Sequence, residues 1–169
     1  MMLLRHLLAI LILPFMMVVM VPRWLVRGFS SSDTRWIDGT IPAAAAHIIG
    51  VLVFLAGFAL FAWCISLFAR IGKGTLAPWD PTKRLVVVGP YRYIRNPMIT
   101  GVLAMLAGEA FFLGSRVIAC WALAFFLINN IYFQLIEEPG LESRFGASYL
   151  EYKAVVPRWL PGDKRWENV

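Results

Sequence analysis

The sequence predicts an all-α membrane protein with about four transmembrane helices. Of the 169 residues, 60% are hydrophobic and 15% are charged, and the apolar residues gather into four long segments. Soluble proteins are about 25% charged, and a helix needs about 20 apolar residues to cross a bilayer. We therefore expect a single integral membrane domain over residues 1–169.

The first two apolar segments cover residues 3–25 and 41–69. A cleavable signal peptide is the alternative for the first, but bulky residues stand where small residues should mark the cleavage site. We expect a retained helix, kinked at Pro14, because proline removes a backbone donor. The second segment is long enough to cross the membrane with a tilt.

The connection over residues 70–97 is rich in proline and in basic residues. Proline excludes one long helix there. Residues 85–88 are expected to be extended and to end in a turn at Gly89 and Pro90. The whole connection should form an ordered loop that packs against the ends of the membrane helices.

Residues 98–115 and 117–136 form the third and fourth expected crossings, an antiparallel hairpin around Gly114. Glu109 lies within the third crossing, and pairing with Arg116 or a headgroup, or protonation, is favoured over a functional role. After this hairpin, an amphipathic pattern predicts an interfacial helix. The residues of that pattern are Leu141, Phe145, Tyr149 and Tyr152.

Most of the 16 Lys and Arg residues lie on the side that holds the 70–97 connection and the C-terminal segment. The positive-inside rule places that side in the cytoplasm, and we expect a bacterial cytoplasmic (inner) membrane. This topology also explains the net charge of +6.

No nucleic-acid partner is expected, since no basic-aromatic platform is apparent. No metal site is expected either, because Cys64 and Cys120 lack ligand spacing.

Two polar motifs lie at the edges of apolar segments. Residues 89–101 read GPYRYIRNPMITG, and residues 136–146 read IEEPGLESRFG. The second motif places Glu137 and Glu138 at the end of a membrane helix, where the helix dipole disfavours carboxylates. The residues alone leave a solvated helix end and a functional site equally open.

Together with Tyr149, Tyr152 and the Val-Pro-Arg sequence at residues 156–158, these motifs resemble the isoprenylcysteine carboxyl methyltransferase / phospholipid methyltransferase family. The resemblance covers residues 76–161. It implies an integral membrane enzyme that uses S-adenosylmethionine, with membrane lipids and a lipophilic small-molecule substrate as partners.

The resemblance also implies which residues bind the cofactor. An acid suits the cofactor's ammonium, a cation suits its carboxylate, and apolar walls suit its adenine. Methyl transfer depends more on alignment and exclusion of water than on acids and bases. No catalytic residue is assigned, although Arg95 and Glu138 are candidates. The implied cofactor-binding residues are Leu85, Val86, Tyr91, Arg95, Asn96, Pro97, Met98, Ile99, Glu137 and Glu138.

The chain departs from the family pattern at three places. Asn96 stands where the family has histidine, and Ile99 stands where tyrosine is common. Phe133 and Gln134 occupy the place of an arginine that serves the substrate of the prenylcysteine enzymes. Asparagine cannot titrate near neutral pH, so a thiol or amine acceptor is favoured, and a carboxylate stays possible.

Two other functional classes remain open. One is a membrane reductase of related architecture that uses NADPH. The other is a non-enzymatic membrane partner, which the Asn96 departure makes conceivable. Stabilisation by S-adenosylhomocysteine but not by NADPH would distinguish the methyltransferase from the reductase.

Overall fold

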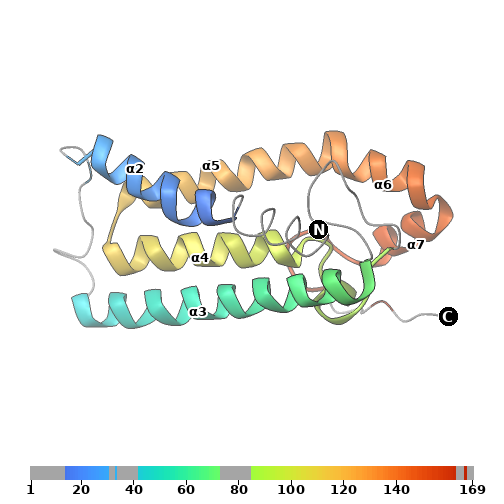
Figure 1. Ribbon diagram of the computed structural model, residues 1–169, viewed down its shortest axis with the longest axis horizontal. Coiled ribbons are helices and arrows are strands. Elements are labelled where there is room, and N and C mark those ends of the chain that lie inside the picture. Colours follow the sequence, from blue (N-terminus) through green and yellow to red (C-terminus); the bar gives the residue numbers. More distant parts are fainter. Residues whose placement is uncertain (1–13, 31–32, 34–41, 73–84, 163–165, 167–169) are drawn as a thin grey trace, which may run out of the picture.

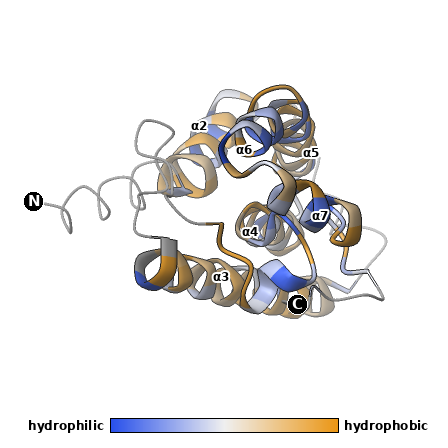
Figure 2. Ribbon diagram, turned by 90° about the vertical axis from the view of Figure 1, so that its right-hand side faces the viewer, coloured by the Kyte–Doolittle hydropathy of each residue, from blue (hydrophilic) through white to orange (hydrophobic). Residues whose placement is uncertain are grey.

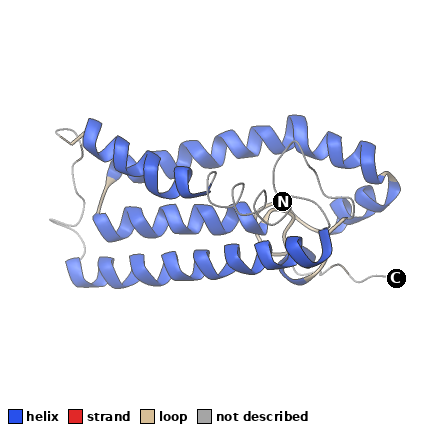
Figure 3. Cartoon of the chain, viewed as in Figure 1, coloured by secondary structure: helices blue, strands red, loops and turns tan. Residues whose placement is uncertain are grey.

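The computed structural model describes residues 14–30, 33, 42–72, 85–162 and 166. Three long helices, α3 (Ala43–Leu67), α4 (Pro97–Leu113) and α5 (Arg116–Tyr132), run side by side along the long axis (Figure 1). Within the described ranges there are helices and connections but no strands (Figure 3). The expected all-α class is confirmed for this part of the chain.

The N-terminal helical segment changes its hydrogen-bonding pattern just after Pro14. A π-helix, η1 (Met16–Met20), leads into the α-helix α2 (Val21–Gly28). Proline disturbs the regular hydrogen-bond ladder, and π-bulges are a common way to accommodate such a disturbance. The start of the expected first crossing, residues 3–13, lies outside the described residues.

Helices α3 and α4 are antiparallel and touch through glycines. A Cβ atom added to Gly57 would lie 2.6 Å from the carbonyl oxygen of Gly101, and one added to Gly50 would lie 2.8 Å from that of Gly108. Small residues let helix backbones approach closely in membranes. The two pairs therefore hold α3 against α4 along most of the length of α4.

The predicted hairpin of the third and fourth crossings is present. Helix α4 ends at Gly114, whose φ of 62° suits glycine. Helix α5 then begins after Ser115, whose hydroxyl accepts the N–H of Ile118 at 3.2 Å. The carboxylate of Asp33 accepts hydrogen bonds from the Ser115 hydroxyl and the Val117 N–H, so this turn is capped twice.

Two helices are long and apolar enough to cross a membrane: α3, with 25 residues, and the continuous helix Arg116–Phe145, with 30. Helix α4 is also apolar but has 17 residues. The count of four crossings therefore stays a prediction.

The C-terminal part differs from the single interfacial helix that the sequence suggested. Helix α5 continues through a π-helix, η5 (Phe133–Glu137), into α6 (Glu138–Phe145). The chain then turns at Gly146, with φ of 56°, into α7 (Ala147–Val155). Glycine adopts a positive φ at little cost, so the chain turns here and the amphipathic pattern is divided between two short helices. Both contain hydrophilic residues (Figure 2).

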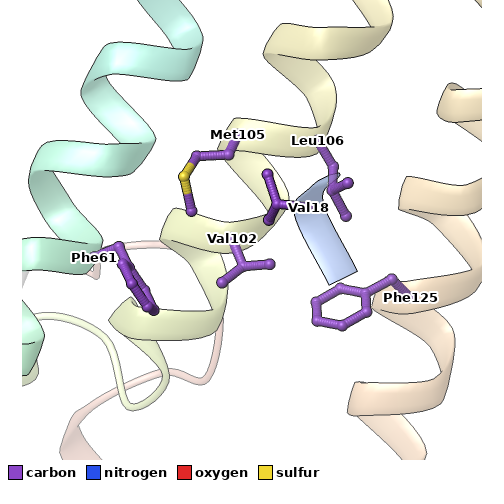
Figure 4. Close-up of a cluster of buried hydrophobic side chains, with 6 residues drawn as sticks. All are labelled: Val18, Phe61, Val102, Met105, Leu106 and Phe125. Carbon is purple, nitrogen blue, oxygen red and sulfur yellow. The ribbon is translucent and has the colours of Figure 1, made fainter. Parts of the chain in front are cut away.

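The main hydrophobic core is centred on α4. Three of its residues, Val102, Met105 and Leu106, pack between side chains from α3, α5 and η1 (Figure 4). Those partners are Phe61, Phe125 and Val18. This core lies next to the start of α4, where the first polar motif ends.

Candidate active site

The first polar motif is fixed against the C-terminal segment by backbone hydrogen bonds. The N–H of Arg95 donates to the carbonyl of Pro157 at 2.9 Å, and the N–H of Asn96 donates to that of Arg158 at 3.3 Å. These bonds lie just before α4 begins, at the end of the bundle that carries α6 and α7 (Figure 1). The two motifs and the Val-Pro-Arg sequence therefore meet at one end of the molecule.

Glu138 is the centre of a buried ionic cluster. Nη1 of Arg95 lies 2.9 Å from Oε1 of Glu138, and Nε of Arg158 lies 2.7 Å from the same oxygen. Nζ of Lys153 lies 3.1 Å from the other carboxylate oxygen. Glu138 is 5% exposed. A carboxylate buried to this degree needs opposite charges and hydrogen bonds, and three cations supply them.

A buried hydrogen-bond donor of Arg95 has no partner among the described residues. Its side chain is 11% exposed, and its Nη1 also reaches the Tyr149 hydroxyl at 3.5 Å. Its Nε is buried and has no hydrogen-bond partner among the residues that the structure describes. An unsatisfied buried donor costs about 1–3 kcal/mol. An anionic ligand beside Arg95 would satisfy it.

Arg158 connects the cluster to the membrane helix α5. Its Nη1 donates to Oδ1 of Asn130 at 3.2 Å, and Nε1 of Trp159 donates to the same oxygen at 3.0 Å. Sequence reasoning gave no role to Arg158, Lys153 or Asn130. An asparagine in an apolar helix was an available signal, since polar groups in membrane helices usually have a partner.

Aromatic and apolar side chains line the other side of the first motif. Val86 and Tyr91 pack with Cys64 in a buried cluster that Met98 also contacts. The Tyr152 hydroxyl donates to the carbonyl of Tyr91 at 2.7 Å. Burial, followed by the neighbouring Cys64, holds the pKa of Tyr91 well above its ordinary value. Burial also raises the pKa of Tyr152, so both phenols are neutral near pH 7.

The remaining predicted residues are placed in different surroundings. Pro97 is buried at the first position of α4, after Asn96, whose side chain makes no capping hydrogen bond. Leu85 packs with the tyrosines of α7. Ile99 instead packs against the main core. Glu137 is half-buried, and no ion pair of the described residues includes it.

The fold and this cluster define a helical, membrane-associated protein with a buried ionic site at one end of its bundle. The chain belongs to the phospholipid methyltransferase family, whose model matches residues 45–148. Membership confirms the resemblance drawn from the two motifs and the enzyme class, methyltransferase, at the level of the family. It does not favour the reductase alternative.

One relative is the phosphatidylethanolamine N-methyltransferase of the fungus Botryotinia fuckeliana (strain B05.10). It is 34% identical over 146 residues, which cover 79% of this chain. The chain spans about 15% of the length of that relative. No solved structure matches the chain.

Proposed function

We propose that this protein transfers a methyl group from S-adenosylmethionine to the amine of a membrane phospholipid. The observation that carries the proposal is the buried Arg95–Glu138–Arg158 cluster, with its free Arg95 donor, in a chain of the phospholipid methyltransferase family. S-adenosylmethionine supplies the electrophilic methyl group. The protein has to bind it, align the acceptor with it and exclude water.

Arg95 is suited to hold the cofactor's carboxylate. Its Nε is buried and unpartnered, and Glu138 and Tyr149 hold its Nη1 in place. A guanidinium whose position is fixed loses little freedom when it binds an anion. In this proposal Glu138 is a positioning residue, because both of its oxygens are already engaged by cations.

Glu137 is the better ligand for the cofactor's ammonium group. The family pattern favoured Glu138 for this role and left Glu137 less certain, but both oxygens of Glu138 are engaged by cations. Glu137 is next to the cluster in the chain and has no ion-pair partner among the described residues. Its charge also contributes to the raised pKa of Tyr91, after burial, Cys64 and Tyr152. Val86, Tyr91 and Met98 would form the apolar wall for adenine.

An amine acceptor fits the titratable groups of this site. Asn96 stands in the place of the family's histidine, and the nearby Tyr91 and Tyr152 hold their protons. The headgroup is an ammonium near pH 7, so it first gives one proton to water. The neutral amine then attacks with its own lone pair: the N–C bond forms, the C–S bond of the sulfonium breaks, and the product is a methylated ammonium. The name of the fungal relative, a phosphatidylethanolamine N-methyltransferase, supports the same acceptor class.

The test uses the full-length protein in lipid nanodiscs with methyl-labelled S-adenosylmethionine. Label should enter phosphatidylethanolamine and should not enter a long-chain alcohol of matched chain length, which would need a base. Calorimetry should show binding of S-adenosylhomocysteine but not of NADPH. Robust methylation of the alcohol, or binding of NADPH alone, would overturn the proposal.

A further inference from the structure

A cavity of about 690 Å³ lies between α2, α3 and α4, away from the ionic cluster. Its lining is largely apolar and includes Val18, Phe54, Leu55 and Phe112. Glu109 lines the cavity from α4. It lies twelve residues after Pro97, the first residue of α4, and twelve residues extend about 18 Å along a helix. The cavity is therefore separate from the proposed methyl-transfer site.

The glycine contacts and the position of α2 explain why this space exists. Gly50 and Gly108, where α3 and α4 touch, are both part of the cavity lining. Helix α2 packs against α5, so its other face borders the cavity instead of filling it. Val51 and Leu55 lie at the cavity and are 43% and 55% exposed, which leaves an apolar entrance on the outside of the bundle.

Three charged side chains, one acidic and two basic, line this otherwise apolar cavity. Oε2 of Glu109 is buried and has no hydrogen-bond partner among the described residues. Arg23 and Arg27 also line the cavity, one helical turn apart on α2, and both are exposed. Among the described residues Arg116 does not pair with Glu109; pairing with a headgroup and protonation, the other two alternatives expected for Glu109, stay predictions. No ion pair found in the described part of the chain joins Glu109 to any arginine.

We infer that this cavity binds one zwitterionic phospholipid with a primary-amine headgroup. Its ammonium would donate to the free oxygen of Glu109, its phosphate would pair with Arg23 and Arg27, and an acyl chain would lie along the apolar lining. An unpartnered carboxylate oxygen needs an N–H donor, which a quaternary ammonium lacks. The ligand is therefore ethanolamine-like and not choline-like. The site shares no residue with the proposed methyl-transfer site, so neither proposal depends on the other.

Photo-crosslinking can locate such a lipid. The full-length protein is reconstituted with phosphatidylethanolamine that carries a diazirine near the carboxyl end of one acyl chain. After irradiation, adducts are mapped by peptide mass spectrometry. We expect adducts concentrated on residues 18–26 and 51–55, with at least tenfold less label when phosphatidylcholine carries the same group. Equal labelling by the two lipids, or labelling spread evenly over the outer face of α5, would overturn the inference.

Variants test the charged contacts. Glu109→Gln keeps the volume and removes the charge, and it should lower labelling by phosphatidylethanolamine about tenfold, since one charge-assisted hydrogen bond is lost. Arg23→Gln with Arg27→Gln, on a helix that carries no part of the ionic cluster, should have a similar effect even if Glu109→Gln folds poorly. Arg116→Gln, a charge removal outside the cavity, is the control and should leave labelling unchanged. Unchanged labelling in the double arginine variant would contradict the site.

Discussion

At the scale of single residues, the two adjacent glutamates have opposite surroundings. Glu138 is buried and bound by Arg95, Lys153 and Arg158, whereas Glu137 has no ion-pair partner among the described residues. Removing one member of a buried ionic group leaves the others uncompensated. We therefore expect Glu138 to stabilise the ionic cluster and Glu137 to be available for a ligand.

We predict that Glu138→Gln is the more destabilising of the two changes. It leaves the cations of a largely buried cluster without their counter-charge, which should cost about 3 kcal/mol. Thermal unfolding in detergent should show a lower Tm for Glu138→Gln and little change for Glu137→Gln. Equal Tm values for the two variants would contradict the assignment of Glu138 as a positioning residue.

Glu137→Gln should instead weaken cofactor binding. Loss of a charge-assisted hydrogen bond to the ammonium is worth roughly 1.5–3 kcal/mol, or about tenfold or more in Kd. Calorimetry with S-adenosylhomocysteine measures this directly in the folded protein. Glu151→Gln, an exposed glutamate on α7, is the matched control. A normal Kd in Glu137→Gln would exclude the proposed ammonium contact.

Arg95→Lys tests the free donor of the cluster. Lysine keeps the positive charge, so the pair with Glu138 can persist, but it lacks Nε and the planar geometry of a guanidinium. We expect Tm to change little and the Kd of S-adenosylhomocysteine to rise about tenfold. The same change at the exposed Arg116, which is no part of the ionic cluster, should alter neither quantity. If Arg95→Lys binds the cofactor normally, the Nε of Arg95 does not contact it.

At the scale of helices, the packing of α3 on α4 depends on glycines that meet in pairs. Gly57 faces Gly101 and Gly50 faces Gly108, at a seven-residue spacing in both helices. The seven-residue spacing of Gly101 and Gly108 was visible in the sequence, but their partners on α3 were not identified. The spacing repeats two turns along each helix, which keeps both contacts on one face.

Gly57→Ala should loosen this helix pair. Its added Cβ would lie 2.6 Å from the carbonyl of Gly101, so the backbones must separate, at a cost of about 1–3 kcal/mol for an overpacked contact. We expect a lower Tm by thermal unfolding in detergent. Gly140→Ala is the control, because nothing lies within 4 Å of an added Cβ there. A Tm for Gly57→Ala equal to that of Gly140→Ala would show that the close contact is not needed.

At the scale of the whole molecule, the charged residues of the described chain divide between the two ends of the bundle. The ionic cluster lies at the end of the bundle that carries α6 and α7. Helix α2 and the start of α5 lie at the other end (Figure 1), and they carry Arg23, Arg27 and Arg116. The positive-inside rule then predicts that the ionic cluster faces the cytoplasm, where S-adenosylmethionine is made.

Cysteine labelling in intact cells tests this orientation. We expect a membrane-impermeant maleimide added outside to label Ser30→Cys and not Gly162→Cys; both positions are exposed. The unmodified protein, with Cys64 and Cys120, measures the background. The reverse pattern would place the ionic cluster outside the cytoplasm and contradict the proposed access to the cofactor.

The sequence by itself determined the all-α class, the family and the two motifs that contribute Arg95 and Glu138 to the ionic cluster. Each of these depends on information that is local in the chain: apolar runs such as residues 41–69 favour helices, and the two polar motifs carry the family resemblance. The helical hairpin around Gly114 follows in the same way, because a glycine between two apolar segments is a local signal for a turn.

Only the tertiary structure decided which charges meet. Arg95, Lys153 and Arg158 reach Glu138 because α5 continues into α6, the chain reverses at Gly146, and the C-terminal segment hydrogen-bonds to the start of α4. The same is true of the cavity beside Glu109, which exists because α2 packs on α5 while glycines bring α3 onto α4. The physical reason is that ion pairing and cavity formation depend on distances between segments far apart in the chain, and neither hydropathy nor motif spacing encodes those distances.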